Sequence, residues 1–531
     1  MDDALIPATP HDAAAATAAE WTARSRAHVW HPCTQMQDHE SQIPLLPIAS
    51  AEGVWLIGHD GRRYLDAVGS WWTNIFGHRH PLIVDRLKAQ LDVLDHVIFA
   101  GFTHEPAVKL AEKLCALAPT GLNRCFFADN GSAAVEVALK MSAHYWRNRG
   151  APAKTKFIAL SNGYHGETLG ALAVGGTGMY RDAYAPMLMQ PIYVQSPDCF
   201  ERAPGASWED HTRQAFRHME AALARHAHEV AAVIVEPLVQ CAGGMRMYHP
   251  VYLSLLREAC TRHGVHLIAD EIAVGFGRTG RLFACEWAED HQQASTARRD
   301  PRRPATDGLN GGSGDSLAKD GNTVSGEPAR ADRPGPQRPR ETARETPKRI
   351  CVSPDFMCLS KGLTGGTMAL AAVLTTDDVY AAFYDDYASG KAFLHSHSYT
   401  ANPIACAAAL ATLEIFEQRD WHAQNRGLGH LMWMSVSELL SHPHVAEVRQ
   451  QGMILAIELA KNPNQREPYP AAERRGLKVY RHALNAHKDW GAVLRPLGNV
   501  VYFMPPYTIT PEQLAQLGRI AIEGIDQATR N

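Results

Sequence analysis

The middle of the chain alternates between two hydrophobic patterns. Short apolar runs of strand length recur, and the segments between them carry apolar residues at i, i+3 and i+4, which indicates amphipathic helices. The predicted strands are residues 125–128, 157–160, 230–235, 265–269, 356–359 and 369–374, and the predicted helices are residues 133–147, 211–225 and 251–263. This alternation is typical of βαβ units, so we expect an α/β fold with a mostly parallel sheet and helices on both faces.

The two ends of the chain show other patterns. Near the N-terminus, residues 53–57 and 63–66 flank His59-Asp60-Gly61, a turn signal that predicts a hairpin. Helices are also predicted at residues 82–94, 107–117, 406–418 and 428–440, and strands at residues 453–459 and 500–503. The change of pattern after Asn402 favours a smaller α+β domain, which we expect to include the N-terminal hairpin.

One long segment interrupts the alternation. Residues 290–349 contain no Phe, Trp or Tyr and are rich in Gly, Pro, Arg, Asp and Ser. Such a segment cannot bury enough apolar surface to offset its ordering entropy, so we expect a disordered insertion on the surface. Residues 1 to about 20 are Ala-rich and are interpreted as a frayed leader. The predicted division is residues 1–80 as the N-terminal segment of a small domain, 81–400 as the large domain, and 401–531 as the C-terminal part of the small domain.

Composition limits the choice of partners. The formal net charge of −4 disfavours a nucleic acid or an anionic membrane as a partner. The ten cysteines include no C-x-x-C pair, so reduced thiols are expected. Met1-Asp2-Asp3 begins no export signal, and no apolar run approaches the ~18 to 20 residues of a membrane span. We expect a soluble, cytoplasmic protein with no nucleic-acid or membrane partner and no metal site.

Two predicted strands end in residues that carry chemistry. The strand at residues 265–269 is followed by Asp270, and the strand at residues 356–359 is followed closely by Lys361. The carboxyl ends of parallel strands form the ligand-binding edge of such a sheet. A lysine amine can form a Schiff base with pyridoxal phosphate, and a carboxylate can hold the pyridine nitrogen protonated. Each residue alone is more often a capping residue that faces solvent, so the hypothesis depends on the other motifs.

Three further motifs follow predicted strands of the same series. Gly131 and Ser132 open a helix, where backbone N–H groups and the helix dipole favour an anion, although this is also an ordinary N-cap. Tyr164 lies in a Gly-rich loop, where its ring could lie on a planar cofactor, with a core tyrosine as the alternative. Glu236 ends another strand and either neutralises an arginine, binds substrate or simply caps the strand.

Residues 267–280, Leu-Ile-Ala-Asp-Glu-Ile-Ala-Val-Gly-Phe-Gly-Arg-Thr-Gly, and residues 359–366, Leu-Ser-Lys-Gly-Leu-Thr-Gly-Gly, resemble the signature of class III aminotransferases. The resemblance covers nearly the whole chain from about His28 onward, apart from the insertion. It implies the fold type I architecture of pyridoxal phosphate enzymes, with a large domain that contains a mostly parallel sheet, a smaller α+β domain and a homodimer. It also implies that pyridoxal 5'-phosphate is the cofactor.

The resemblance assigns expected roles to individual residues. Lys361 and Asp270 are the implied catalytic residues, as the Schiff-base lysine and the partner of the pyridine nitrogen. The implied cofactor-binding set is Gly131, Ser132, Tyr164, Asp270, Lys361, His397 and Ser398, with Ser398 reaching the phosphate of the partner subunit. The implied substrate-binding set is Trp71, Tyr164, Lys361, Ser396, Arg495 and Tyr502, with Arg495 suited to a carboxylate by its planar fork.

Within the family, several motifs are most similar to those of members that act in biotin biosynthesis. They are His28-Val29-Trp30-His31-Pro32, Ser70-Trp71-Trp72, residues 163–166, residues 494–496 and residues 502–507. The implied reaction converts 8-amino-7-oxononanoate to 7,8-diaminononanoate, with S-adenosylmethionine as the amino donor and lysine as the alternative. Other readings remain open: an ω-aminotransferase acting on 4-aminobutyrate or ornithine, an aminomutase that needs no donor, or a binding protein that has kept only the fold.

The chain departs from the family pattern in three places. The insertion separates Asp270 from Lys361 by 91 residues (361 − 270), a separation that adds little loop-closure entropy because that entropy grows only logarithmically with length. Cys33 stands where many relatives have tyrosine, which removes a hydroxyl from the expected substrate pocket. Residues 395–398, His-Ser-His-Ser, stand where many relatives have His-Gly-Pro-Thr, so the donor side of the pocket is expected to differ.

Overall fold

The computed structural model describes residues 17–288 and 351–530. The predicted insertion and most of the predicted leader lie outside these residues, although the leader prediction is wrong at its end, because helix α1 (Ala18–His28) already begins there. The central element is a sheet in the order β4-β12-β11-β10-β7-β5-β6. Its strands are β4 (Leu122–Ala128), β12 (Ala371–Thr376), β11 (Phe356–Leu359), β10 (His266–Asp270), β7 (Val230–Val235), β5 (Lys156–Leu160) and β6 (Ile192–Val194).

The predicted α/β fold with a mostly parallel sheet is confirmed. Every neighbouring pair from β11 to β6 is parallel, whereas β12 runs antiparallel to both β11 and β4. Strands β11 and β12 are buried on both faces along nearly all of their length, so their apolar runs do not reveal their directions. The three-residue strand β6 was not predicted, because a run of that length carries no period.

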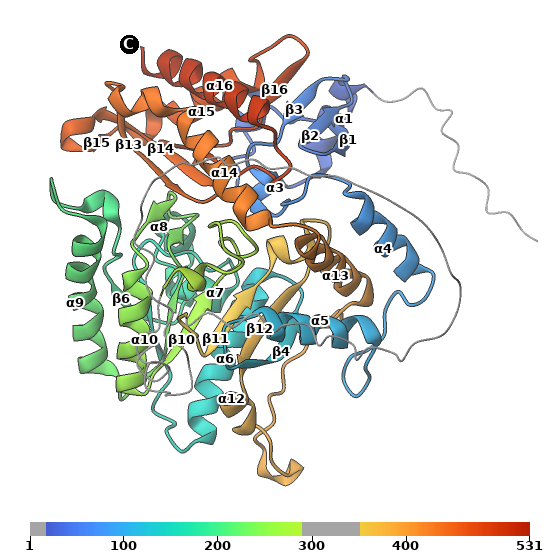
Figure 1. Ribbon diagram of the computed structural model, residues 1–531, viewed down its shortest axis with the longest axis vertical. Helices are drawn as coiled ribbons and strands as arrows, with labels where there is room; N and C mark the ends of the chain where they lie inside the picture. Colours follow the sequence, from blue (N-terminus) through green and yellow to red (C-terminus); the bar gives the residue numbers. More distant parts are fainter. Residues whose placement is uncertain (1–16, 289–350, 531) are drawn as a thin grey trace, which may run out of the picture.

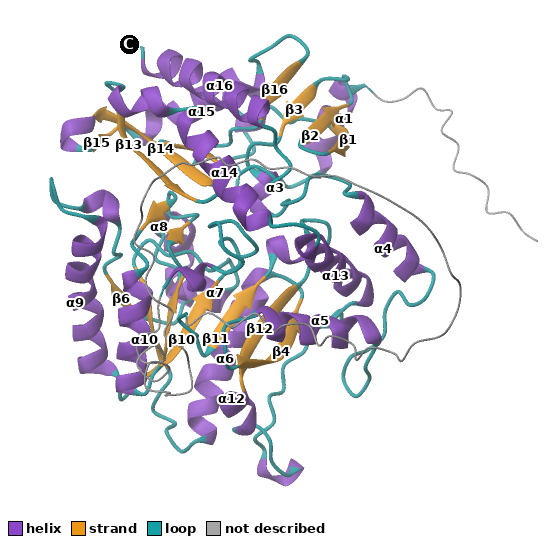
Figure 2. Ribbon diagram, viewed as in Figure 1, coloured by secondary structure: helices purple, strands orange, loops and turns teal. Residues whose placement is uncertain are grey.

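Helices cover both faces of the sheet (Figures 1 and 2). Along β7, Val233 and Val235 share a core with α9 (Trp208–His226) and α10 (Val251–His263). Ala232 and Ile234, which point the opposite way, share a core with α6 (Gly131–Asn148). The alternation from Ala232 to Val235 therefore separates two apolar cores, as expected for a strand with period-two side chains.

A second group of helices packs beside β4 and β12. It contains α4 (Pro81–Leu91), α5 (Glu105–Leu117) and α13 (Pro403–Glu417), and α13 contacts both of the others. The next helix, α14 (Trp421–Met434), overlaps the predicted helix at residues 428–440 but begins and ends several residues earlier. That prediction missed the cap: the side chain of Asp420 accepts a hydrogen bond from the backbone N–H of Ala423 and starts the helix there.

The N-terminal and C-terminal parts of the chain meet in one small sheet. The predicted hairpin is present as β2 (Trp55–Gly58) and β3 (Arg63–Leu65), and β3 also pairs in parallel with β16 (Trp490–Ala492). Figure 1 shows these N-terminal strands, in blue, beside the C-terminal elements, in red. A second four-stranded sheet contains β13 (Val445–Gln451), β14 (Ile454–Asn462), β15 (Glu467–Pro468) and β17 (Val500–Phe503).

Several further helices and strands of the described residues were not predicted from the sequence. They are α2 (Asp38–Ser41), α3 (Gly69–Trp72), α7 (Leu169–Val174), α8 (Gly178–Arg181), α12 (Asp377–Ala381), α15 (Arg475–Leu484), α16 (Pro511–Thr529), β1 (Ile48–Glu52), β8 (Val239–Gln240) and β9 (Arg246–Met247). Within residues 17–288 and 351–530, no helix combines the length and apolarity that a membrane crossing requires.

Candidate active site

Asp270 and Lys361 lie at the ends of neighbouring strands. Asp270 is the last residue of β10 and pairs with Cys358 of β11, three residues before Lys361. Both side chains line one cavity of about 190 Å³. Its wall also includes Trp72, Asn130, Gly131, Ser132, Tyr164 and Glu236. The sequence argument that the two strand ends meet at one site is therefore matched by the register of the sheet.

Lys361 occupies a special backbone position. Its φ is +45°, in the left-handed region, at the start of a 3₁₀ turn (Lys361–Thr364). Its Nζ lies 4.6 Å from the centroid of the Trp72 ring. Burial lowers the pKa of the ammonium, although Cys241, Asp270 and Glu236 act in the opposite direction. A lysine with a lowered pKa holds more of the neutral amine, which is the nucleophilic form.

Asp270 is buried, with 4% of its surface exposed, and is held by two donors. The Oδ2 atom lies 2.8 Å from Nδ1 of the equally buried His165, and Oδ1 accepts a hydrogen bond from the backbone N–H of Ile272 at 3.1 Å. Because both oxygens are engaged, the carboxylate has a fixed orientation at the cavity wall. A fixed, buried carboxylate of this kind can hold a protonated ring nitrogen.

An anion cradle lies at the start of α6, an 18-residue helix. The side chain of Asn130 caps the helix by accepting from the N–H of Ala133, which leaves the N–H groups of Gly131 and Ser132 at the cavity. The Ser132 hydroxyl accepts from the N–H of Glu167 at 3.1 Å. A Cβ at Gly166 would lie 2.0 Å from that hydroxyl oxygen, so this position requires glycine. The donor set fits a phosphate group.

Tyr164 is fixed at both ends beside this cradle. Its backbone N–H donates to Glu236 Oε2 at 2.9 Å, and its hydroxyl donates to Glu167 Oε1 at 2.9 Å. Burial and the nearby carboxylate of Glu167 raise the pKa of the phenol well above its ordinary value. The ring therefore stays neutral and presents an aromatic surface to the cavity. Glu167 is a positioning residue that the sequence analysis missed.

The structure settles which groups contact Glu236. Its carboxylate accepts hydrogen bonds from the backbone N–H groups of Tyr164 and Cys241. Burial raises its pKa to about 7, and the positive charge of His165 would act against that shift. Glu236 therefore ties two loops together at the cavity wall through backbone contacts.

Cys33, Trp71 and Arg495, three residues that the sequence places at the expected substrate pocket, lie together and are called here the substrate mouth, although none of them lines the cavity. The guanidinium carbon of Arg495 lies 5.1 Å from the centroid of the Trp71 ring, and Arg495 Nη2 donates to the backbone oxygen of Cys33 at 3.5 Å. Burial and Glu167 raise the pKa of the Cys33 thiol. Tyr502 lies deeper, where its hydroxyl accepts a hydrogen bond from Trp72 Nε1 at 3.1 Å.

The Trp71 loop is held in an unusual backbone conformation. Gly69, Ser70, Trp71 and Trp72 all have positive φ, between 44° and 73°. Left-handed backbone costs about 1–2 kcal/mol for each non-glycine residue. Asp66 offsets part of this cost by accepting from the backbone N–H and hydroxyl of Ser70, at 3.0 and 2.7 Å.

A buried arginine also holds the Trp71 loop in place through hydrogen bonds to backbone oxygens. Arg278 is 1% exposed and donates to four backbone carbonyl oxygens, those of Trp72, Asn74, Met504 and Pro505. Burial lowers the pKa of its guanidinium group. Arg278 belongs to the motif at residues 267–280, but this role was not predicted, because its partners are backbone atoms of distant segments.

Residues 395–398 lie apart from the cavity of their own chain. Ser396 and Ser398 are exposed, and neither lines the cavity. His397 Nδ1 lies 3.2 Å from Oδ2 of Asp129, which precedes the anion cradle. Nε2 of His395 lies 3.1 Å from Nε2 of His397, within hydrogen-bonding distance. Of these predicted residues, His397 alone is connected to the cradle within the described chain.

Comparison with known proteins agrees with this geometry. A family model described as aminotransferase class-III matches residues 36–294 and 347–525. The adenosylmethionine-8-amino-7-oxononanoate aminotransferase of Geobacter sulfurreducens is 37% identical over 504 residues, which cover 95% of this chain and 96% of the relative.

Solved structures give the same result. The structure of adenosylmethionine-8-amino-7-oxononanoate aminotransferase from Methanocaldococcus jannaschii has a TM-score of 0.79 and 32% identity, covering 96% of this chain and 99% of the other. The omega transaminase from Pseudomonas jessenii in complex with PMP has a TM-score of 0.78 and 25% identity, covering 96% of this chain and 98% of the other. The family match spans well over half of the sequence, and this chain belongs to the class III aminotransferases.

Proposed function

We propose that this aminotransferase converts 8-amino-7-oxononanoate to 7,8-diaminononanoate, with pyridoxal 5'-phosphate as cofactor and S-adenosylmethionine as amino donor. The observation that carries the proposal is the convergence of Lys361, Asp270 and the anion cradle on one cavity. The names of the curated relatives, at 32% to 38% identity over most of their length, support this choice of reaction.

The donor set at the cavity fits the cofactor. Gly131 and Ser132 would hold its phosphate, Tyr164 would lie on its ring, and Asp270 would bind its pyridine nitrogen. When bound, pyridoxal phosphate supplies an aldehyde that accepts amines and a ring that accepts electrons. Lys361, with its lowered pKa, would be the amine that first holds the aldehyde and then moves a proton as general acid–base.

The substrate mouth supports recognition of a distal carboxylate. Arg495 faces the mouth beside Trp71, and Tyr502 lies behind Trp72. A guanidinium group can donate two parallel hydrogen bonds to a carboxylate, which selects a keto acid by charge and length. Trp71, 41% exposed, offers apolar surface to the aliphatic chain of such a substrate. With Cys33 in place of a hydroxyl-bearing residue, the mouth offers a weak thiol donor at that position.

The assembly and the division of the chain belong to the same proposal. In a homodimer, the exposed Ser396 and Ser398 would reach the partner's cofactor site, with His397 between them. The proposed division keeps residues 81–400 as the large cofactor-binding domain and joins residues 1–80 with 401–531 in the small domain. The pairing of β3 with β16 supports that joining. We further propose that the protein acts in the cytoplasm.

The donor assay tests the proposal. Purified holoenzyme is given 8-amino-7-oxononanoate with S-adenosylmethionine, with lysine, or with no donor, and 7,8-diaminononanoate is measured by mass spectrometry. We expect product with S-adenosylmethionine and none without donor, and product with lysine alone would reassign the donor. Turnover of 4-aminobutyrate or ornithine without any diaminononanoate would overturn the proposed reaction. The Lys361→Ala protein, prepared in parallel, is the blank.

A further inference from the structure

A second cavity, called here the arginine pocket, lies away from the candidate active site. Its volume is about 510 Å³, within the range of ligand pockets in proteins. The 3₁₀ turn Cys199–Glu201 and the start of α9 form one wall, and α14 and β13 form the other. Six large side chains dominate the wall: Phe200, Arg202, Trp208, Trp433, Arg449 and Arg466.

The arginine pocket has an excess of positive charge. Its lining holds three guanidinium groups and one carboxylate, that of Glu447. Arg202 pairs with Glu447 at 2.7 Å, and Arg449 pairs with Glu458 at 2.8 Å. Arg466 donates to the backbone oxygen of Arg202 at 3.0 Å and has no carboxylate partner within residues 17–288 and 351–530. The pocket is therefore complementary to an anion.

One buried donor in the wall lacks an acceptor. Arg449 is 1% exposed, and two of its nitrogens donate to the backbone oxygens of Met245 and Gly244. Its Nη1 atom makes no hydrogen bond among the described residues and forms only a long ion pair, at 3.6 Å, with Oε2 of Glu447, which has no hydrogen-bond partner there either. A buried donor without an acceptor is costly, so an anionic oxygen in the cavity would be stabilised there.

The aromatic side chains define the shape of the expected ligand. The guanidinium carbon of Arg466 lies 5.2 Å from the centroid of the Phe200 ring, and that of Arg202 lies 6.0 Å from Trp208. Trp433 adds another indole to the lining. Indole and guanidinium planes stack on aromatic rings, which favours an anion carried on a planar ring over a bare ion.

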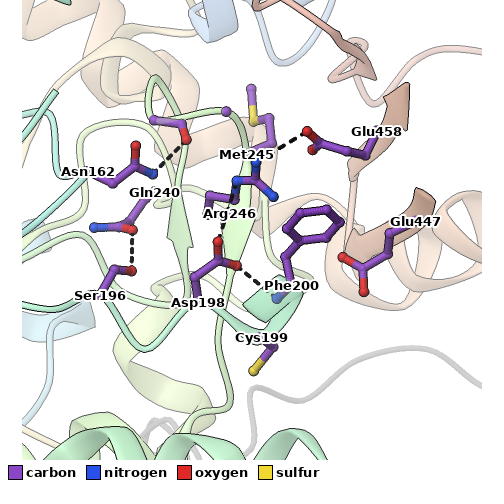
Figure 3. Close-up of polar contacts among 12 residues, drawn as sticks. Asn162, Ser196, Asp198, Cys199, Phe200, Gln240, Met245, Arg246, Glu447 and Glu458 are labelled. Atoms are coloured by element: carbon purple, nitrogen blue, oxygen red, sulfur yellow. Dashed lines mark hydrogen bonds and ion pairs between the residues drawn. The ribbon is translucent and has the colours of Figure 1, made fainter. Parts of the chain in front are cut away.

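The arginine pocket lies next to the hairpin of β8 and β9, which supports the loop that carries Tyr164. The hairpin of β8 and β9 carries the backbone oxygens that Arg449 holds, and the oxygen of Gly243 in its turn accepts from Asn162 Nδ2 at 2.6 Å. Figure 3 shows Arg246, on the same hairpin, between Asp198 and Glu458. Arg449 thus lines the arginine pocket and also binds the hairpin that supports the Tyr164 loop.

We propose that the arginine pocket binds a ring-bearing phosphate of mononucleotide size, with the phosphate on Arg466 and Arg449 Nη1 and the ring against the aromatic wall. The phosphate together with the ring distinguishes this ligand from 8-amino-7-oxononanoate, which has no ring, and from S-adenosylmethionine, whose adenosine carries no phosphate. The site is separate from the anion cradle, which the cofactor phosphate would fill in the holoenzyme.

Calorimetric titration of the holoenzyme with AMP tests the proposal, with adenosine and inorganic phosphate as probes that lack one half of the ligand. We expect one AMP per chain, with a Kd below ~1 mM, and binding at least about tenfold weaker for each half alone. Saturating 8-amino-7-oxononanoate should leave AMP binding unchanged. Absence of AMP binding, or its loss when that substrate is added, would overturn the proposal.

Matched variants locate the site. Arg466→Ala should weaken AMP binding about tenfold or more, and Glu447→Gln should strengthen it several-fold, because that substitution removes the one lining carboxylate. Lys461→Ala is the control, since Lys461 is an exposed cation of β14 that pairs with Glu467 outside the pocket. Equal affinities in all three variants would contradict the assignment. Glu447→Gln keeps its side-chain shape and decides the question if Arg466→Ala fails to fold.

Discussion

The cofactor side of the cavity and the substrate mouth are built in different ways. The cofactor side consists of Asp270 and Lys361, at the ends of the neighbouring strands β10 and β11, and of Gly131 and Ser132, at the start of α6, which follows β4. The substrate mouth brings together residues that are hundreds of positions apart, and its loop keeps a left-handed backbone. Regular secondary structure therefore positions the residues of the cofactor side, whereas a loop with left-handed backbone carries a residue that we propose contacts the substrate.

The largest effect is expected from the cofactor side. Lys361→Ala removes the amine that holds the aldehyde and moves the proton, so turnover should fall by about 10⁴-fold or more. The cradle and Asp270 remain, so the variant should still bind pyridoxal phosphate, as measured by absorbance after gel filtration. Lys109→Ala, at an exposed position of α5 where the lysine pairs with Glu105, is the control. Turnover near that of the unmodified protein would remove Lys361 from the proposed mechanism.

The buried hydrogen bonds of Arg278 should contribute strongly to the stability of the protein. Arg278→Met leaves four backbone carbonyl oxygens without their donor, so the free energy of unfolding should fall by about 3–5 kcal/mol. Denaturant titration measures the change. Arg213→Met, which removes a half-exposed arginine of α9, should change stability by less than about 0.5 kcal/mol. Equal losses in the two variants would show that the buried contacts contribute little.

The substrate mouth should change affinity more than chemistry. Arg495→Ala removes a charged hydrogen-bonding partner worth about 1.5–3 kcal/mol, so KM for 8-amino-7-oxononanoate should rise about 10-fold to 150-fold. The kcat should change little, because Arg495 is not among the residues that line the cavity of Lys361. Steady-state kinetics at fixed donor concentration separate the two parameters, with Arg481→Ala as the surface control. A large fall in kcat at unchanged KM would place Arg495 in the chemical step instead.

The smallest effect concerns pH. Glu271 is fully buried, and burial raises its pKa from the ordinary 4.5 to about 7, against the backbone N–H groups of Ala284 and Cys285 that favour the charged form. Between pH 4.5 and 7 the folded protein keeps a proton that the unfolded chain loses, so this contribution to stability declines as pH rises. A glutamine at this position stays neutral at every pH. Between pH 5 and pH 8 the Glu271→Gln variant should therefore lose roughly 2 kcal/mol less stability than the unmodified protein. An unchanged pH profile would contradict a raised pKa at this position.

The two regions also differ in how well the sequence predicts them. The approach of Asp270 to Lys361 was predictable because the carboxyl ends of adjacent parallel strands share one edge, whatever the length of the intervening loop. The role of Arg278 was not, because its partners are backbone carbonyls and no side-chain pattern records them. The antiparallel direction of β12 was also hidden, since a strand buried on both faces reads the same in either direction. The roles of Trp71, Arg495, Ser396 and Ser398 stay predictions.

The most direct test of the central claim is to find which lysine carries the cofactor. Holoenzyme is reduced with borohydride, digested and mapped by mass spectrometry for the pyridoxyl modification. The geometry at the ends of β10 and β11 predicts stoichiometric modification of Lys361. A pyridoxyl group on any other lysine, with Lys361 unmodified, would contradict it.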